Sequence, residues 1–279
     1  MQKNKKIIMT ADDFGMKATR DEAIKDSFLN GFLTSTCICA NGESYLTAIK
    51  EVLPKCVKNG KKIDLGVHLD LIEGFSLTNC PKLTRKNKKF KHGFISLLLH
   101  SFSKSFLKEV EQELKAQTEL VVSMAREQGF EISFINSHIH FHAIPNIFKI
   151  VKKIAHEYNI PFIRTQKEIP ALLSEVKPIN YIKVGVLWFL NLLNKCDFTN
   201  DYIMGVAHTA KMSPDAIYTG VERLSKKDCL IEILCHPDAD MENASGYLEY
   251  QTMLDKELVF DIQKLGFEFS SILDIYNGN

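Results

Sequence analysis

Three histidines alternate with apolar residues in the segment Ser137-His-Ile-His-Phe-His142. If the segment is extended, His138, His140 and His142 lie on one face, because side chains i, i+2 and i+4 of a strand point the same way. Three imidazoles on one face need burial partners or a metal ion. The spacing therefore predicts metal ligands at the end of a strand.

Other side chains capable of chemistry also stand at the ends of short apolar runs. They are Asp12, Asp13, Asn41, His68, Arg164 and His236. Two neutral imidazoles and one carboxylate can hold a metal ion that lowers the pKa of a bound water towards ~7 and polarises a carbonyl. A spare carboxylate and a spare imidazole can then act as base and acid. This combination predicts hydrolysis of a poor electrophile such as an amide.

Strand-like and helix-like segments alternate about seven times and must position these side chains. In order they are Lys6–Thr10, Ala18–Leu29, Thr34–Ala40, Glu43–Val52, Asp64–His68, Phe102–Gln128, Ile132–Asn136, Asn146–Tyr158, Phe162–Arg164, Pro170–Glu175, Tyr202–Ala207, Pro214–Leu224, Cys229–Cys235, Tyr250–Leu265 and Phe267–Phe269. The alternation predicts an α/β fold with mostly parallel strands, closed into a distorted or incomplete (β/α) barrel. We expect one domain over residues 1–279, with the polar strand ends in one pocket.

Composition limits the partners and the compartment. The net charge of +1 gives no global field for nucleic acid or an anionic membrane. Seven cysteines without a C-x-x-C pair favour a reducing cytoplasm. The basic start is followed by too short an apolar run for an export signal, and Tyr181–Leu193 is shorter than the roughly 20 residues of a membrane span. We expect Val184–Leu193 to be core or, alternatively, the surface of a homodimer.

The ordered motifs resemble those of the YdjC-like carbohydrate deacetylases, which include the chitooligosaccharide deacetylases. The matching segments are Thr10–Gly15, Gly31–Thr36 with Ala40-Asn41, Gly66–Gly74, Ser137–His142 with Pro145, and Cys235–Pro237. They occur in the family's order and cover nearly the whole chain. An ordered set of this kind is far more specific than any one of its motifs.

The resemblance implies a role for each matching residue. Asp13, His68 and His138 correspond to the ligands of one divalent metal ion. Asp12 corresponds to the catalytic base and His236 to the general acid, with Arg164 orienting the base, and we expect Asn41, His140 and His142 to contact the substrate. Two positions differ from the family pattern: Asn136 replaces the usual Asp, and Ile139 replaces Gln or His. The change at Asn136 removes a charge beside the metal ligands.

The sequence therefore favours a metal-dependent hydrolase that removes an N-acetyl group from an acetylated amino sugar, in an oligosaccharide, glycan or glycolipid. Imidazole ligands favour zinc over magnesium, which is the other ion to consider. Two alternatives stay open. One is a metal-dependent phosphoesterase, because His-x-His at a barrel strand end also occurs in phosphoesterase sites. The other is a non-catalytic sugar-binding protein, for which Asn136 is the hint.

Overall fold

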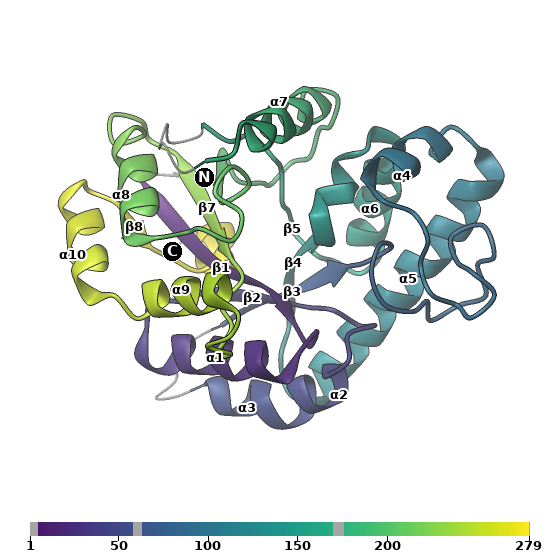
Figure 1. Cartoon of the computed structure of the whole chain (residues 1–279), viewed down its shortest axis with the longest axis horizontal. Coiled ribbons are helices and arrows are strands. Elements are labelled where there is room, and N and C mark those ends of the chain that lie inside the picture. The colour runs from purple at the N-terminus through teal and green to yellow at the C-terminus, as the bar shows by residue number, and fades with distance from the viewer. Residues whose placement is uncertain (1–4, 58–62, 170–175, 279) are drawn as a thin grey trace.

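Eight parallel strands form one strongly curled sheet in the computed structural model, which describes residues 5–57, 63–169 and 176–278 (Figure 1). The strands are β1 (Lys6–Phe14), β2 (Ser35–Ile38), β3 (Asp64–Leu69), β4 (Ile132–Ser137), β5 (Phe162–Ile163), β6 (Tyr202–Met204), β7 (Leu230–Cys235) and β8 (Glu268–Phe269). Their order is β5-β4-β3-β2-β1-β7-β6, and β8 pairs with the start of β1. The predicted parallel, incomplete α/β barrel is confirmed.

The two edges of this sheet approach each other beyond the short strand β5. A parallel bridge joins Glu168, five residues after β5, to Ile203 in β6. The Glu168 carboxylate also accepts hydrogen bonds from the backbone N–H groups of Gly205 and Ala207, at 3.0 and 2.9 Å. These contacts tie an irregular segment to β6 where a full barrel would have a longer strand.

Helices surround the sheet and connect its strands (Figure 1). They are α1 (Ala18–Asn30), α2 (Tyr45–Thr47), the π-helix Ala48–Val52, α3 (Leu53–Cys56), α4 (Phe94–His100), α5 (Lys104–Glu127), the 3₁₀ segment His138–Ala143, α6 (Pro145–Glu157), α7 (Pro178–Asn191), α8 (Pro214–Glu222), α9 (Ala244–Met253), α10 (Lys256–Lys264) and α11 (Ile272–Asn277). The predicted segment Pro170–Glu175 lies outside the described residues. No helix in the described part of the chain is both long and apolar enough to cross a bilayer.

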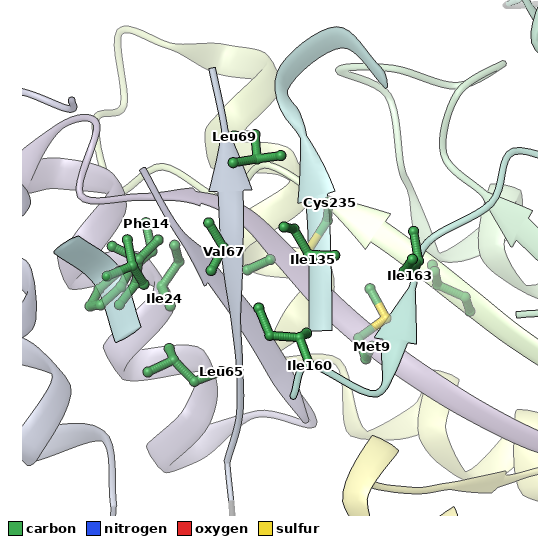
Figure 2. Packing of buried hydrophobic residues seen from close by; sticks show 14 of the residues in the cluster. Met9, Phe14, Ile24, Leu65, Val67, Leu69, Ile135, Ile160, Ile163 and Cys235 are labelled. Atoms are coloured by element: carbon green, nitrogen blue, oxygen red, sulfur yellow. The ribbon is translucent and has the colours of Figure 1, made fainter. Parts of the chain in front are cut away.

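Alternating residues of each strand face the two sides of the sheet, as the period of an extended chain requires. Figure 2 shows Leu65, Val67 and Leu69 of β3 with Ile135 of β4 in the core between the sheet and its helices. The opposite, inward set forms a second apolar cluster, made of Ile8, Cys37, Phe134, Phe162, Phe198, Leu230, Ile272 and Ile275. Because Ile272 and Ile275 belong to α11, that helix closes one end of the barrel.

The inward side becomes polar towards the carboxyl ends of the strands. Ile8 is followed by Thr10 and Asp12, Phe134 by Asn136, and Leu230 by Glu232, all buried. Position 66, two residues before His68 on the same strand, is a glycine because a Cβ atom there would lie 2.5 Å from the Phe134 ring. The barrel thus has an apolar base and a polar layer above it.

Candidate active site

A cavity of about 620 Å³ opens at the carboxyl ends of the strands. Its lining includes six of the predicted site residues, namely Asp12, Asp13, His68, His138, His140 and His236. The part of the lining that comes from α4 and α7 is mostly apolar. The topology therefore brings together side chains more than 200 residues apart, as expected for a parallel α/β sheet.

Asp13 lies at the centre of the polar part of the lining. Its φ of 68° is left-handed, and the pairing of β1 with β2 shifts register between Ala11 and Phe14. An irregularity of this kind re-aims a side chain, so the consecutive residues Asp12 and Asp13 both line the cavity. Asp13 Oδ1 lies 3.2 Å from His68 Nε2 and 3.1 Å from His138 Nδ1, while Asp13 Oδ2 accepts a hydrogen bond from Arg20.

The ring of His68 is oriented by Asn136. Its Nδ1 donates to Asn136 Oδ1 across 2.7 Å, and the amide nitrogen of Asn136 lies 3.3 Å from Asp12 Oδ1. With the proton on Nδ1, His68 Nε2 carries a lone pair, is buried and has no hydrogen-bond partner. Two acceptors, His68 Nε2 and Asp13 Oδ1, therefore face each other across 3.2 Å.

This arrangement fits a metal ion. Ligand atoms of a tetrahedral zinc site are about 3.3 Å apart, given zinc–nitrogen bonds of ~2.0 Å, close to the two separations at Asp13 Oδ1. Burial alone raises the pKa of Asp13, but the neighbouring imidazoles of His138 and His68 lower it well below its usual value. Burial alone lowers the pKa of His138, but Asp13 and Glu73 raise it to about 11. A cation, either a proton or a metal ion, is therefore stabilised here.

Among the residues that the structure describes, two further groups each bring three possible ligand atoms within 4.8 Å of one another. They are Asp12/Cys37/His68 and Asp13/Cys39/His68. Burial raises the pKa of both thiols well above its usual value, so Cys37 and Cys39 stay protonated and are poor ligands. The carboxylate and imidazole set of Asp13, His68 and His138 is chemically the better match.

The predicted strand face of three histidines is wrong. Strand β4 ends at Ser137, and His138–Ala143 forms 3₁₀ turns in which Ile139 and His140 have left-handed φ values of 51° and 56°. The turns send the three rings in different directions. His138 meets Asp13, and His140 lines the cavity with a buried Nδ1 that has no hydrogen-bond partner.

His142 points away from the cavity. It is fully buried, its Nδ1 lies 2.6 Å from Ser137 Oγ, and its Nε2 lies 3.0 Å from the Arg164 carbonyl oxygen. Asn41 is also outside the cavity lining, where its amide donates to the Glu73 carbonyl oxygen at 3.2 Å. These positions fit residues that hold the ends of β4 and β3, rather than residues that touch a substrate.

A buried ion-pair network supports Asp12 from behind. Arg164 Nη1 and Nη2 donate to the two oxygens of Asp12 at 2.5 and 2.8 Å, and Arg164 Nε donates to Glu232 Oε1 at 3.0 Å. Burial alone raises the pKa of Asp12, but Arg164 lowers it far below its usual value. Arg164 is absent from the cavity lining, so it positions Asp12 and keeps it ionised.

His236 faces the cavity from the other side of β1, after β7. Its Nδ1 lies 3.7 Å from Glu249 Oε2, and the same carboxylate accepts the backbone N–H of His236. Burial alone lowers the pKa of His236, but Glu249, Asp13 and Asp12 raise it above its usual value. Because Nδ1 faces Glu249, the Nε2 atom is the one available to a ligand.

Four supporting residues were not identified from the sequence: Cys37, Arg20, Glu232 and Glu249. A signal existed for Glu232, since it is a charged residue in the otherwise apolar run Leu230-Ile-Glu-Ile-Leu234, and buried charges need partners. Glu249 lies on α9 and Arg20 on α1, without a distinguishing pattern around them. Only the packing of these helices on the strand ends reveals their contacts.

The chain belongs to the YdjC-like family, whose model, described as YdjC-like protein, matches residues 6–264. The chain is 25% identical to a carbohydrate deacetylase of Clostridium beijerinckii over 97% of this chain and 100% of that protein. It is 27% identical to a carbohydrate deacetylase of Halalkalibacterium halodurans over 88% of this chain and 91% of the relative. A chitooligosaccharide deacetylase of Citrobacter koseri is 25% identical over 96% of this chain and 98% of its own.

A solved structure shows the same fold. It is a protein of Enterococcus faecalis V583 whose name assigns it provisionally to cellobiose-phosphate cleavage. The two structures superpose with a TM-score of 0.71 and 21% identity, covering 98% of this chain and 99% of the other.

Proposed function

We propose that this chain is a metal-dependent deacetylase that removes the N-acetyl group from an acetylated amino sugar. The observation that carries the proposal is the pair of buried acceptors, His68 Nε2 and Asp13 Oδ1, facing each other at 3.2 Å beside His138. The relatives named carbohydrate deacetylases support the reaction class. The cavity above the pair is large enough for a sugar.

Asp13, His68 and His138 would hold the ion. When bound, it supplies a Lewis acid that activates water and polarises the acetyl carbonyl. Zinc is the ion that best suits two imidazoles and one carboxylate, and magnesium, which prefers oxygen ligands, is the alternative that metal analysis would reveal. Asn136 supports this set although it lacks the charge of an aspartate, because its oxygen still fixes the His68 ring.

The remaining side chains divide the proton transfers. Asp12 takes the proton of the attacking water while the oxygen adds to the acetyl carbon. As the carbon–nitrogen bond breaks, His236 Nε2 donates a proton to the departing amine, and acetate and the free amino sugar result. Arg164 keeps Asp12 aligned, so Asp12 accepts its proton only transiently. His140, which lines the cavity, is the predicted hydrogen-bond partner of the substrate.

Product analysis tests the proposal against the two alternatives. We expect the metal-loaded protein to release acetate from N-acetylglucosamine-containing saccharides or glycolipids, and to release no phosphate from sugar phosphates. Phosphate release without acetate would establish the phosphoesterase alternative. Sugar binding without either product would establish a binding protein. The cytoplasm stays the proposed compartment, supported by seven cysteines that are all free thiols.

A further inference from the structure

Helix α7 exposes an unusual amount of apolar surface. Its Val184, Leu187 and Leu190 are buried against the body of the protein. A second stripe faces outward at the spacing of one helix face and is made of Ile182, Val186 and Phe189, continued by Leu193 in the turn after the helix. Ile182 and Phe189 are each 61% exposed. Trp188 and Leu192 are exposed as well. A helix that is apolar on all sides normally has apolar surroundings on all sides.

Helix α4 extends this surface. Ile95 and Leu99, one turn apart, are 63% and 67% exposed. Phe94, at the start of α4, packs against the cluster that contains Val184 and Leu187 of α7. Phe94 therefore connects the start of α4 to α7, and both helices contribute to the lining of the same cavity. We call their exposed residues, with those of the turn after α7, the α4/α7 apolar face: Ile95, Leu99, Ile182, Val186, Trp188, Phe189, Leu192 and Leu193.

The charged residues within the two segments that carry the α4/α7 apolar face are all lysines. Residues 176–196 contain Lys177, Lys183 and Lys195 and no Asp or Glu. Residues 93–108 contain Lys104 and Lys108 and again no acidic residue. The chain as a whole is nearly neutral, so this is a local arrangement. Exposed apolar side chains with Trp and flanking lysines are typical of protein surfaces that lie in the interface of an anionic membrane.

The same face is continuous with the cavity of the candidate active site. Ile95, Ile182 and Val186 are exposed and also line the cavity, together with Ile179 and Lys183. A body that covers this face therefore meets the cavity entrance. A second copy of the chain would obstruct the cavity entrance and place lysines opposite lysines. A lipid surface would instead bring a substrate anchored in that surface to the cavity entrance.

We propose that the α4/α7 apolar face docks on an anionic lipid surface, and that the substrate is an acetamido sugar carried by a lipid. The second part rests on the proposed function and narrows its substrate class. The lipid part of the substrate would lie along Ile179, Ile182 and Val186, with the acetamido group at Asp13, His68 and His138. Lys183, which lines the cavity beside these apolar residues, would face the lipid headgroup region.

Vesicle binding tests the docking without any measurement of catalysis. The full-length protein is sedimented with vesicles of phosphatidylcholine, with or without phosphatidylglycerol. We compare wild type with Phe189→Ser/Leu193→Ser, two exposed residues outside the cavity lining, and with Phe260→Ser on α10, which is 60% exposed. We expect binding to anionic vesicles that weakens with salt, falls about tenfold in the double variant and is unchanged in Phe260→Ser.

Absence of vesicle binding by the wild type, or equal binding by the α7 double variant, would overturn the proposal. So would a stable dimer in solution that Phe189→Ser/Leu193→Ser dissociates, because a second copy would then cover the face. A rate measurement tests the substrate class separately. The double variant should deacetylate a short soluble acetamido saccharide at the wild-type rate and an acetamido glycolipid in vesicles several-fold more slowly. Failure of acetate release on both substrates, with vesicle binding intact, would reject the deacetylase function alone.

Discussion

Asp12 accepts two hydrogen bonds from Arg164, although 152 residues separate them in the sequence. Both side chains are buried inside the barrel, where a carboxylate without a partner would be costly. The planar guanidinium matches both carboxylate oxygens of Asp12 and donates two further N–H groups to Glu232. The pairing keeps Asp12 ionised and fixes its orientation at the edge of the cavity.

Asp12→Asn should remove most of the turnover and leave the metal in place. Asn cannot take the proton of the attacking water, and a general base typically contributes about 10²–10⁴-fold to kcat. Metal content, measured on the same sample, should stay at the wild-type level because Asp12 is not a proposed ligand. Denaturant unfolding serves as the control, since the substitution also weakens a buried ion pair. Wild-type turnover in a folded Asp12→Asn protein would remove Asp12 from the mechanism.

Replacing a proposed metal ligand, in contrast to Asp12→Asn, should lower the metal content. His68→Ala and His138→Ala should each lose bound zinc and turnover, while His156→Ala, on the exposed surface of α6, should lose neither. Elemental analysis after dialysis measures the difference. Metal binding should also weaken as the pH falls, because protons compete for the same imidazoles. Full occupancy in both variants would disprove the ligand set.

Asn136→Leu tests whether the amide replaces the family's aspartate in function. The variant retains the bulk of the side chain but loses the acceptor for His68 Nδ1. Loss of such an orienting bond typically lowers metal affinity by about 10–100-fold. Titration with a competing chelator measures the change. An unchanged affinity would show that the His68 ring is held by its packing instead.

Glu249→Gln should shift the pH profile of the reaction. The Glu249 carboxylate raises the pKa of His236, so its removal lowers that pKa. A general acid works only while protonated, and activity is therefore lost as the pH rises through its pKa. The alkaline limb of the kcat profile should move to lower pH in Glu249→Gln and disappear in His236→Ala. An alkaline limb that does not move would assign it to another group.

Sequence patterns predicted which strand-end side chains lie together in one cavity, but not their geometry. Apolar strands that end in Asp12, His68 and His236 predicted the strand-end site because parallel strands have a fixed polarity. The strand predicted from alternation at His138–His142 is wrong because the backbone turns at Ile139 and His140. Neither residue type indicates a left-handed φ in a sequence. The roles of Glu249 and Arg20 depend on how helices pack on the sheet, and single-chain spacing contains no information on this.

His142 leads to a prediction about stability. Burial lowers the pKa of His142 to about 3, against about 6.5 in an unfolded chain. Between these two pH values the unfolded chain binds a proton that the folded protein excludes. The free energy of unfolding must therefore fall as the pH decreases from ~6.5 to ~3. The slope is at most about 1.4 kcal/mol per pH unit for one group.

In His142→Gln this contribution should vanish while the remaining acid sensitivity persists, because Gln does not titrate. Urea unfolding at several pH values measures the slope, with His156→Gln as the control, since that histidine is exposed. Equal slopes in wild type and His142→Gln would mean that His142 becomes protonated within the folded protein.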